Sequence, residues 1–129
     1  MVFAAYASHL TKLWDAVIMK CEIRKAGSIT LFSIRGDIVF NHLNDIRETI
    51  KGEMAQSTTD KFLIDLGGVG MIDSAGVGFI VSVYKTVLSR KGSFALVRPN
   101  DAVKSVLQTV GLTRLFNIYE SEDEAIKAI

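Results

Sequence analysis

Apolar and polar residues alternate along the chain with two different periods, and the pattern predicts a hairpin followed by helices and strands in turn. Two short runs, residues 21–25 and 28–34, flank Gly27 and predict the two strands of a β-hairpin. From about residue 41 to residue 54, apolar side chains recur every three or four positions, which predicts a helix. Those side chains are Leu43, Ile46, Ile50 and Met54. The continuously apolar residues 62–64 are typical of a strand covered on both faces.

The second half of the chain continues this alternation. A helix is predicted after the glycine-rich segment, and Lys91 and Gly92 are expected to end it as a basic residue and a C′ glycine. Its predicted buried stripe consists of Val77, Ile80, Val81, Tyr84, Val87 and Leu88. Residues 94–97 predict the next strand, and residues 99–101 start a helix that Gly111 closes. The core-facing residues of that helix are predicted to be Val103, Val106, Leu107 and Val110.

The last predicted elements are shorter. Residues 115–119 predict a strand, and Ser121 is a predicted N-cap because acidic residues follow it at the positive end of a helix. Ala125, Ile126 and Ile129 complete this final helix. Strands and helices therefore alternate after the hairpin, which predicts an α/β fold. We expect a single domain with a mixed central sheet of about 4–5 strands packed against about four helices, plus an N-terminal helix.

The first 19 residues form a separate amphipathic segment, whose apolar positions fall at helical spacing on one face. These positions are Phe3, Tyr6, Leu10, Leu13, Trp14 and Val17. His9, Lys12 and Asp15 interrupt the apolar run, which argues against a membrane span, and no basic region precedes it as in a signal peptide. Three interpretations stay open. In the first, the segment is a helix docked on its own core or on a second copy in a homodimer. In the second, it is a helix that binds a partner or a membrane surface. In the third, the sequence starts upstream of the true start, and the compact domain begins near Met19.

Composition narrows the function classes. Lys and Arg number 15 and Asp and Glu 14, so the net charge of +1 lacks the basic excess that nucleic-acid binders carry. The 129 residues suit one domain, and 49% of them are hydrophobic, as in a folded globule. The single cysteine, Cys21, excludes an internal disulfide and is predicted to be a small buried apolar side chain. A reducing, cytoplasmic location is expected.

The residue types of common active sites do not fall into a catalytic pattern. His9 and His42 have no Cys, Asp or Glu partner at the spacing of metal ligands. The central glycines precede no Lys of a phosphate-binding loop, and Asp73 stands where a dinucleotide fingerprint needs its third glycine. Ser74 lacks the preceding glycine of a nucleophile elbow, because Ile72 stands there. We therefore expect no enzyme activity, no catalytic residue, no metal and no cofactor.

One alternative concerns Asp65, which ends a central strand as the phosphoacceptor of a response-regulator receiver domain does. Such domains need an acidic cluster after their first strand to bind magnesium. The corresponding turn, residues 34–37, offers one acid and an arginine. The receiver-domain interpretation is therefore disfavoured.

Residues 72–76 carry the most informative pattern in the chain. A strand and a glycine-rich loop lead into a helix start, where Asp73 or Ser74 is a natural N-cap. Ala75 and Gly76 keep this end small, so another surface can approach closely. The helix dipole and the free amides would tolerate phosphate on Ser74, which would add roughly −1.5 to −2 charge. The segment suits an on/off binding switch as well as an ordinary N-cap.

Residues 62–78, FLIDLGGVGMIDSAGVG, resemble the signature of STAS domains, the family of bacterial anti-sigma factor antagonists. The family pattern is an apolar strand, D-L-S-G-V, two or three residues, D-S-S/T-G-L-G and an apolar helix. The resemblance runs from about Lys20 to Ile129 and includes the hairpin and Gly36. It implies a STAS-like domain over residues 20–129, with residues 1–19 as an amphipathic helical extension.

The resemblance also implies a mechanism. The unphosphorylated domain binds an anti-sigma factor, usually an ATP-dependent serine kinase, and phosphorylation at the helix start ends the binding. Ser74 is then the expected phosphorylation site of a cytoplasmic transcription regulator that neither contacts nucleic acid nor inserts into a membrane. The expected partner-binding residues are Asp37, Val39, Met71, Asp73, Ala75, Gly76 and Val77. Ile38 and Phe40 are candidates to join the apolar members of this set in one patch, where the 36–41 loop and the helix start should converge.

Two positions depart from the family pattern. In the best-known branch the phosphoacceptor is the second residue after the motif Asp, where this chain has Ala75, whereas stress-signalling scaffold proteins use the position of Ser74. An acidic residue often lies three positions after Gly36, where this chain has Val39. These departures keep an alternative open: a STAS binding or scaffold subunit that is never phosphorylated, in a stress-signalling assembly or beside a lipid-transport ATPase. An enzyme or nucleotide-binding domain of the same layout is disfavoured.

Overall fold

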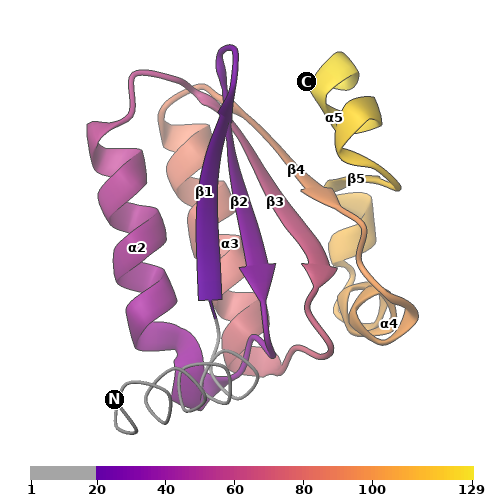
Figure 1. Ribbon diagram of the computed structural model, residues 1–129. Coiled ribbons are helices and arrows are strands. Elements are labelled where there is room, and N and C mark those ends of the chain that lie inside the picture. The colour runs from indigo at the N-terminus through magenta and orange to yellow at the C-terminus, as the bar shows by residue number, and fades with distance from the viewer. Residues whose placement is uncertain (1–19) are drawn as a thin grey trace, which may run out of the picture.

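The computed structural model describes residues 20–129 and confirms the α/β fold, with a five-stranded mixed sheet at its centre (Figure 1). The strands are β1 Lys20–Ala26, β2 Ile29–Arg35, β3 Lys61–Gly68, β4 Ser93–Val97 and β5 Asn117–Tyr119. They lie in the order β1-β2-β3-β4-β5, with β1 antiparallel to β2 and the other neighbours parallel. The parallel pairs need crossover connections, and the helices supply them.

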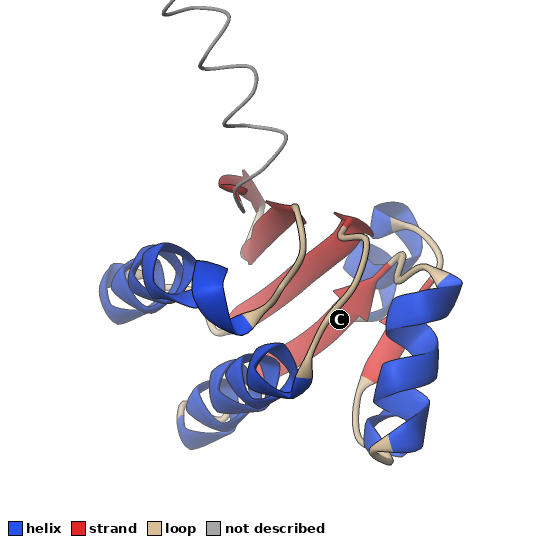
Figure 2. Ribbon diagram, turned by 90° about the horizontal axis from the view of Figure 1, so that it is seen from below, coloured by secondary structure: helices blue, strands red, loops and turns tan. Residues whose placement is uncertain are grey.

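The helices cover the two faces of the sheet unequally. Their bounds are α2 Leu43–Gln56, α3 Ser74–Ser89, α4 Asp101–Thr109 and α5 Glu122–Ala128, with 3₁₀ turns η1 Phe40–His42 and η2 Leu112–Arg114. Figure 2 shows α2 and α3 against one face and α5 on the opposite face. None of the helices in residues 20–129 has the length and apolar character that a membrane crossing requires. The helix predicted for residues 1–19 lies outside the described residues.

Each face of the sheet has its own apolar cluster. On the face of α2 and α3, the rings of Phe32 and Phe62 stack with their centroids 6.1 Å apart. The four residues predicted to form the buried stripe of α2 are all buried: Leu43, Ile46, Ile50 and Met54. On the other face, Ala125 of α5 packs with Leu31, Leu63 and Val97. Strand β3 is thus covered on both sides, which confirms the prediction from its continuous apolar run.

Cys21 behaves largely as the sequence predicts, although it is half-buried rather than fully buried. It lies on β1 and packs against the larger cluster. Burial raises the pKa of its thiol to about 11, so the thiol stays protonated near neutral pH.

Two predicted core positions are wrong. Leu88 is 51% exposed and Val110 is 52% exposed, whereas Phe79 and Val83, which the predicted stripe omits, are buried. Leu88 follows the buried Val87 directly, so the helix turns it about 100° away from the core. Val110 is the C-cap of α4, where the chain has already left the helical face.

The end of α3 also differs from the prediction. The left-handed residue is Lys91, with φ 57°, and not Gly92. Gly92 serves a close approach instead, because a Cβ built there would lie 2.1 Å from the carbonyl oxygen of Asp60. The backbone amide of the next residue, Ser93, donates to that same carbonyl at 2.8 Å. The glycine therefore lets the end of α3 pass directly over the start of β3.

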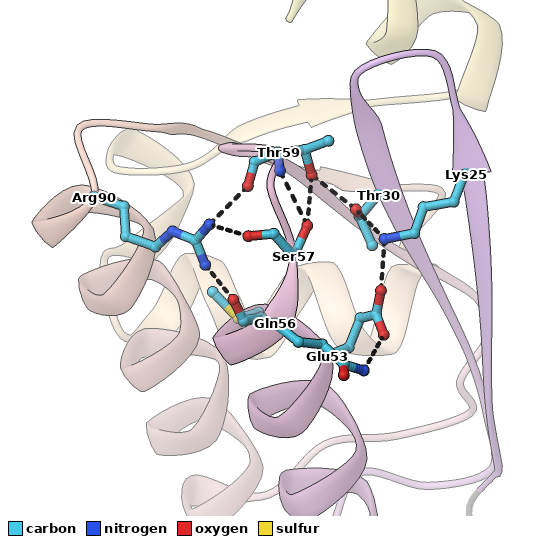
Figure 3. Close-up of polar contacts among 8 residues, drawn as sticks. Lys25, Thr30, Glu53, Gln56, Ser57, Thr59 and Arg90 are labelled. Atoms are coloured by element: carbon cyan, nitrogen blue, oxygen red, sulfur yellow. Dashed lines mark hydrogen bonds and ion pairs between the residues drawn. The ribbon is translucent and has the colours of Figure 1, made fainter.

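Arg90, the C-cap of α3, binds the chain segment that connects α2 to β3. Its guanidinium donates to the backbone carbonyls of Met54, Ser57 and Thr59, as Figure 3 shows. Carbonyls at the end of a helix have no intrahelical donor, and an arginine can supply several donors at once. Arg90 thereby caps α2 from a different helix.

The same network reaches the hairpin. The hydroxyl oxygens of Thr59 and Thr30 lie 2.9 Å apart, and Lys25 donates to Thr30 at 3.0 Å (Figure 3). Lys25 also pairs with Glu53 on α2. Polar contacts therefore join α3, α2 and the β1–β2 hairpin at the end of the domain opposite the start of α3.

Replacing Arg90 with alanine is expected to lower the free energy of unfolding by about 2–4 kcal/mol, because partly buried carbonyls lose their donors. The contact between the guanidinium and the Phe62 ring, 5.3 Å from its centroid, is lost as well. Urea denaturation measures the change. Arg47→Ala, at an exposed position of α2, is the control and should change the free energy by less than about 0.5 kcal/mol. Equal effects would mean that water replaces Arg90 at these carbonyls.

Candidate functional site

Two loops meet at the carboxyl ends of the parallel strands, at the lower end of the sheet in Figure 1. One loop, residues 36–41, follows β2, and the other, residues 69–73, follows β3. Ile38 and Ile72 form an isolated parallel bridge, and the Ile38 amide donates to the Met71 carbonyl at 3.0 Å. This bridge brings together the two segments whose convergence the sequence predicts.

Asp73 ties the two loops to α3. It is the N-cap of the helix, and its Oδ1 accepts from the amide of Gly76 at 2.8 Å. Its Oδ2 accepts from the amide of Phe40 at 3.0 Å. These two hydrogen bonds hold the pKa of this carboxyl below its usual range, and the one from Gly76 contributes more than the one from Phe40. Of the two N-caps that the sequence allows, the structure selects Asp73 over Ser74.

Gly76 is placed by packing. A Cβ built there would lie 2.1 Å from the carbonyl oxygen of Ile38 and 2.7 Å from the side chain of Ile72. The first turn of α3 therefore presses on the loop bridge, and no larger residue fits. Gly78, two positions later, has open space around it and carries no such requirement.

Asp37 and Asn100 fix the outer part of the second loop. Oδ1 of Asp37 accepts from the amide of Met71 at 3.2 Å. The side-chain amide of Asn100 donates to the carbonyls of Val69 and Gly70, at 3.1 and 3.0 Å. Asn100 is also the N-cap of α4. Sequence reasoning placed Asn100 at the start of a helix but missed this second role, which depends on contacts 30 residues away.

The predicted partner-binding residues differ in accessibility. Met71 is 51% exposed, and Ser74 is exposed as the first residue of α3. Five of the other predicted residues are half-buried: Asp37, Val39, Asp73, Ala75 and Val77. Gly76 is buried. Phe40 is 74% exposed, the largest exposed fraction among the large apolar side chains of residues 20–129. Ile38, a candidate for the apolar patch, is fully buried and belongs to the core.

A second polar cluster lies on the sheet face that α5 partly covers. Asp65 is only 2% exposed and accepts from Arg98 through both carboxylate oxygens, at 3.1 and 2.8 Å. Burial would raise the pKa of Asp65, but the hydrogen bonds from Arg98 and from the Gly67 amide favour the carboxylate, and the pKa is lowered. A Cβ on Gly67 would lie 2.8 Å from the Arg98 guanidinium, so this glycine makes room for the arginine.

This cluster changes the interpretation of Asp65. The residue lies inside β3 rather than at its end, and its carboxylate accepts two hydrogen bonds from one arginine. Sequence reasoning missed Arg98, whose backbone has the left-handed φ of 56°. Within residues 20–129, His, Cys, Asp and Glu form no group of three that could hold a metal ion.

Comparison with known proteins gives this architecture a family. A family model described as the STAS domain matches residues 20–125. A candidate anti-sigma factor antagonist of Thermotoga neapolitana is 41% identical over 70 residues, which are 54% of this chain and 62% of that protein. The matched segment spans less than two thirds of the length of that protein and of a second curated relative, from Thermotoga maritima.

Solved structures agree with the family model. The crystal structure of a candidate anti-sigma factor antagonist from Thermotoga maritima has a TM-score of 0.80 and 26% identity, over 84% of this chain and 93% of that one. Unphosphorylated SpoIIAA, an anti-sigma factor antagonist, has a TM-score of 0.74 over 84% of this chain and 95% of that one. Its 20% identity shows a shared fold alone. With a family model that covers nearly all described residues and a matching fold, the chain belongs to the STAS domain family.

Proposed function

We propose that this protein is an anti-sigma factor antagonist, which binds an anti-sigma factor through the end of the domain that carries Ser74. The observation that carries the proposal is the exposed Ser74 at the start of α3, beside the two bridged loops that carry the exposed Phe40 and Met71. Exposed apolar side chains on a fixed backbone are typical of protein-binding surfaces. The names of the sequence relatives support this partner class.

Phosphorylation of Ser74 would end the binding. The phosphate would lie one residue from the Asp73 carboxylate, which already occupies the amides of Gly76 and Phe40. The phosphate and the Asp73 carboxylate would therefore both lie at the contact surface, and the backbone amides of the helix end would not be free to bind the phosphate. The partner in this scheme has serine kinase activity, and the STAS domain acts in the cytoplasm as a binding module and substrate without catalysis of its own.

One observation favours a second candidate function. Ala75 occupies the usual acceptor position of the best-known branch, and here it packs against the core. A protein of this kind binds its partner constitutively, as a scaffold or transporter-associated subunit, and Ser74 is never modified.

The first prediction separates these two functions. The chain is incubated with ATP and with the serine-kinase anti-sigma factors encoded in the same genome, and phosphate is mapped by mass spectrometry. We expect phosphate on Ser74 and none on the Ser74→Ala variant. We also expect Ser74→Asp to weaken binding of that anti-sigma factor by about tenfold or more in calorimetry, a change of about 1.4 kcal/mol.

Ser105→Asp is the matched control, since it adds the same charge at an exposed serine on α4. It should bind like the wild type. Binding of a protein partner without any phosphate on Ser74, and with Ser74→Asp binding normally, would establish the constitutive alternative. Binding of none of the anti-sigma factors would refute the antagonist assignment.

The proposed surface depends on Asp73, which generates a second prediction. Asparagine offers one acceptor oxygen where the carboxylate uses two, so Asp73→Asn leaves either Gly76 or Phe40 without its acceptor. We expect a loss of about 1 kcal/mol of unfolding free energy at neutral pH, the typical net contribution of the one hydrogen bond that is lost, because asparagine can still cap the helix. We also expect weaker binding of the anti-sigma factor, because the loop that carries Phe40 is no longer fixed.

The stabilisation by the Asp73 carboxylate depends on pH, and its direction follows from the lowered pKa. The pKa of Asp73 in the folded protein lies below the ordinary value of 3.8, so its contribution is complete above that value and is lost as the pH falls through the folded pKa. Urea titrations at several pH values should show the wild type and Asp73→Asn converging in acid. Asp101→Asn, at the exposed first position of α4, is the control. A difference that stays constant in acid would contradict the assigned role of the carboxylate.

A further inference from the structure

Two exposed apolar side chains are carried by the loops that meet beside Ser74, on backbone that is fixed before any partner arrives. Phe40 and Met71, which we call the Phe40–Met71 patch, are 74% and 51% exposed. The amide of Phe40 donates to Asp73, and the amide of Met71 donates to Asp37. Both backbones are therefore held by carboxylates. Two large apolar side chains presented on a fixed backbone need a covering surface of apolar character.

The chain itself brings such a surface to this end of the domain. Lys20, the first residue of β1, pairs with Arg35, the last residue of β2. Gly36 follows at once and starts the loop that carries Phe40. Because β1 runs antiparallel to β2, Lys20 lies at the end of the sheet where the patch lies (Figure 1), and residues 1–19 precede it in the sequence.

The sequence of this segment matches the patch in chemistry and reach. Its large apolar residues repeat at helical spacing and would form one apolar stripe. They are Phe3, Tyr6, Leu10, Leu13, Trp14 and Val17. Nineteen residues in a helix span about 28 Å, comparable to the width of a small domain. A short tether also gives an effective concentration of about a millimolar, so a few apolar contacts are enough for docking.

Other described surfaces suit this stripe less well. The sheet face next to Lys20 carries the exposed charged side chains of Glu22, Arg24 and Arg35. The exposed Leu88 lies 14 positions along α3 from Ser74, about 21 Å away at the rise of an α-helix. The Phe40–Met71 patch combines exposed apolar area with proximity to the point of attachment.

We propose that residues 3–17 dock on the Phe40–Met71 patch of the same molecule and compete there with the protein partner. The docking is independent of the proposed function, whereas the competition rests on it. The segment then sets the affinity of the site for its partner, in addition to the phosphorylation of Ser74.

Trp14 is the single tryptophan of the chain, so its fluorescence reports on this segment alone. We expect the emission of the full chain to be shifted to the blue and poorly quenched by acrylamide, because the docked indole is shielded from water. The double variant Phe40→Ser, Met71→Ser should shift the emission to the red and restore quenching. The matched control Leu88→Ser, Leu115→Ser removes two other exposed apolar side chains, 51% and 48% exposed, and should leave the emission unchanged.

Each outcome of the fluorescence experiment either supports or refutes the docking of residues 3–17 on the patch. The same emission in the wild type and the Phe40→Ser, Met71→Ser variant would refute it, as would a red shift in the control variant alone. An emission that moves to the red on dilution would show that a second copy, and not the same molecule, covers the patch. A melting curve of each variant confirms that the domain is still folded.

The competition is tested with the anti-sigma factor that the wild type binds. Leu10→Ser, Leu13→Ser in the full chain weakens the stripe without touching the domain, and should tighten partner binding by about tenfold, the factor that 1.4 kcal/mol of docking removes. Unchanged affinity would refute the competition. If Trp14 responds as expected but no anti-sigma factor binds either form, the docking stands and the proposed function fails.

Discussion

The carboxylate of Asp73 is the interaction on which the candidate site depends. It accepts from the first turn of α3 and from Phe40, 33 residues earlier in the chain. The two amides belong to different segments, so the helix start and the 36–41 loop are placed by one side chain. The exposed positions of Phe40, Met71 and Ser74 follow from that arrangement. Asp73 binds the amide of Phe40, Ser74 follows Asp73 directly, and Met71 precedes the bridge residue Ile72.

The signature of the family therefore mostly builds geometry. Gly76 lets a backbone carbonyl approach the helix start, and Gly67 lets the Arg98 guanidinium reach Asp65. At Gly76 alanine would clash with the backbone, whereas at Gly67 alanine would displace the Arg98 side chain from its place beside Asp65. Few side chains of the motif stay exposed, and Met71 and Ser74 are two of them.

Much of the fold follows from periodicity, because the amphipathic pattern of α2 and the continuous apolar run of β3 record which faces are covered. Periodicity fails where the outcome depends on the exact position of one residue. Leu88 faces solvent although it directly follows the buried Val87. Lys91, and not the neighbouring Gly92, adopts the left-handed backbone conformation. The site was predictable as a motif around Asp73, since caps act locally. Contacts over 30 residues or more, such as those of Arg98 and Asn100, leave no local pattern.

The unequal covering of the sheet has a consequence for the behaviour of the protein in concentrated solution. Helix α5 has seven residues, too few to persist without its contacts, and it is held by Ala125 in the second cluster and by the Glu122–Arg24 pair. Local opening of such a short terminal element costs less than global unfolding. Each opening bares a strip of sheet that includes Leu31 and Leu63, so self-association should begin on this face rather than at the loops beside Ser74.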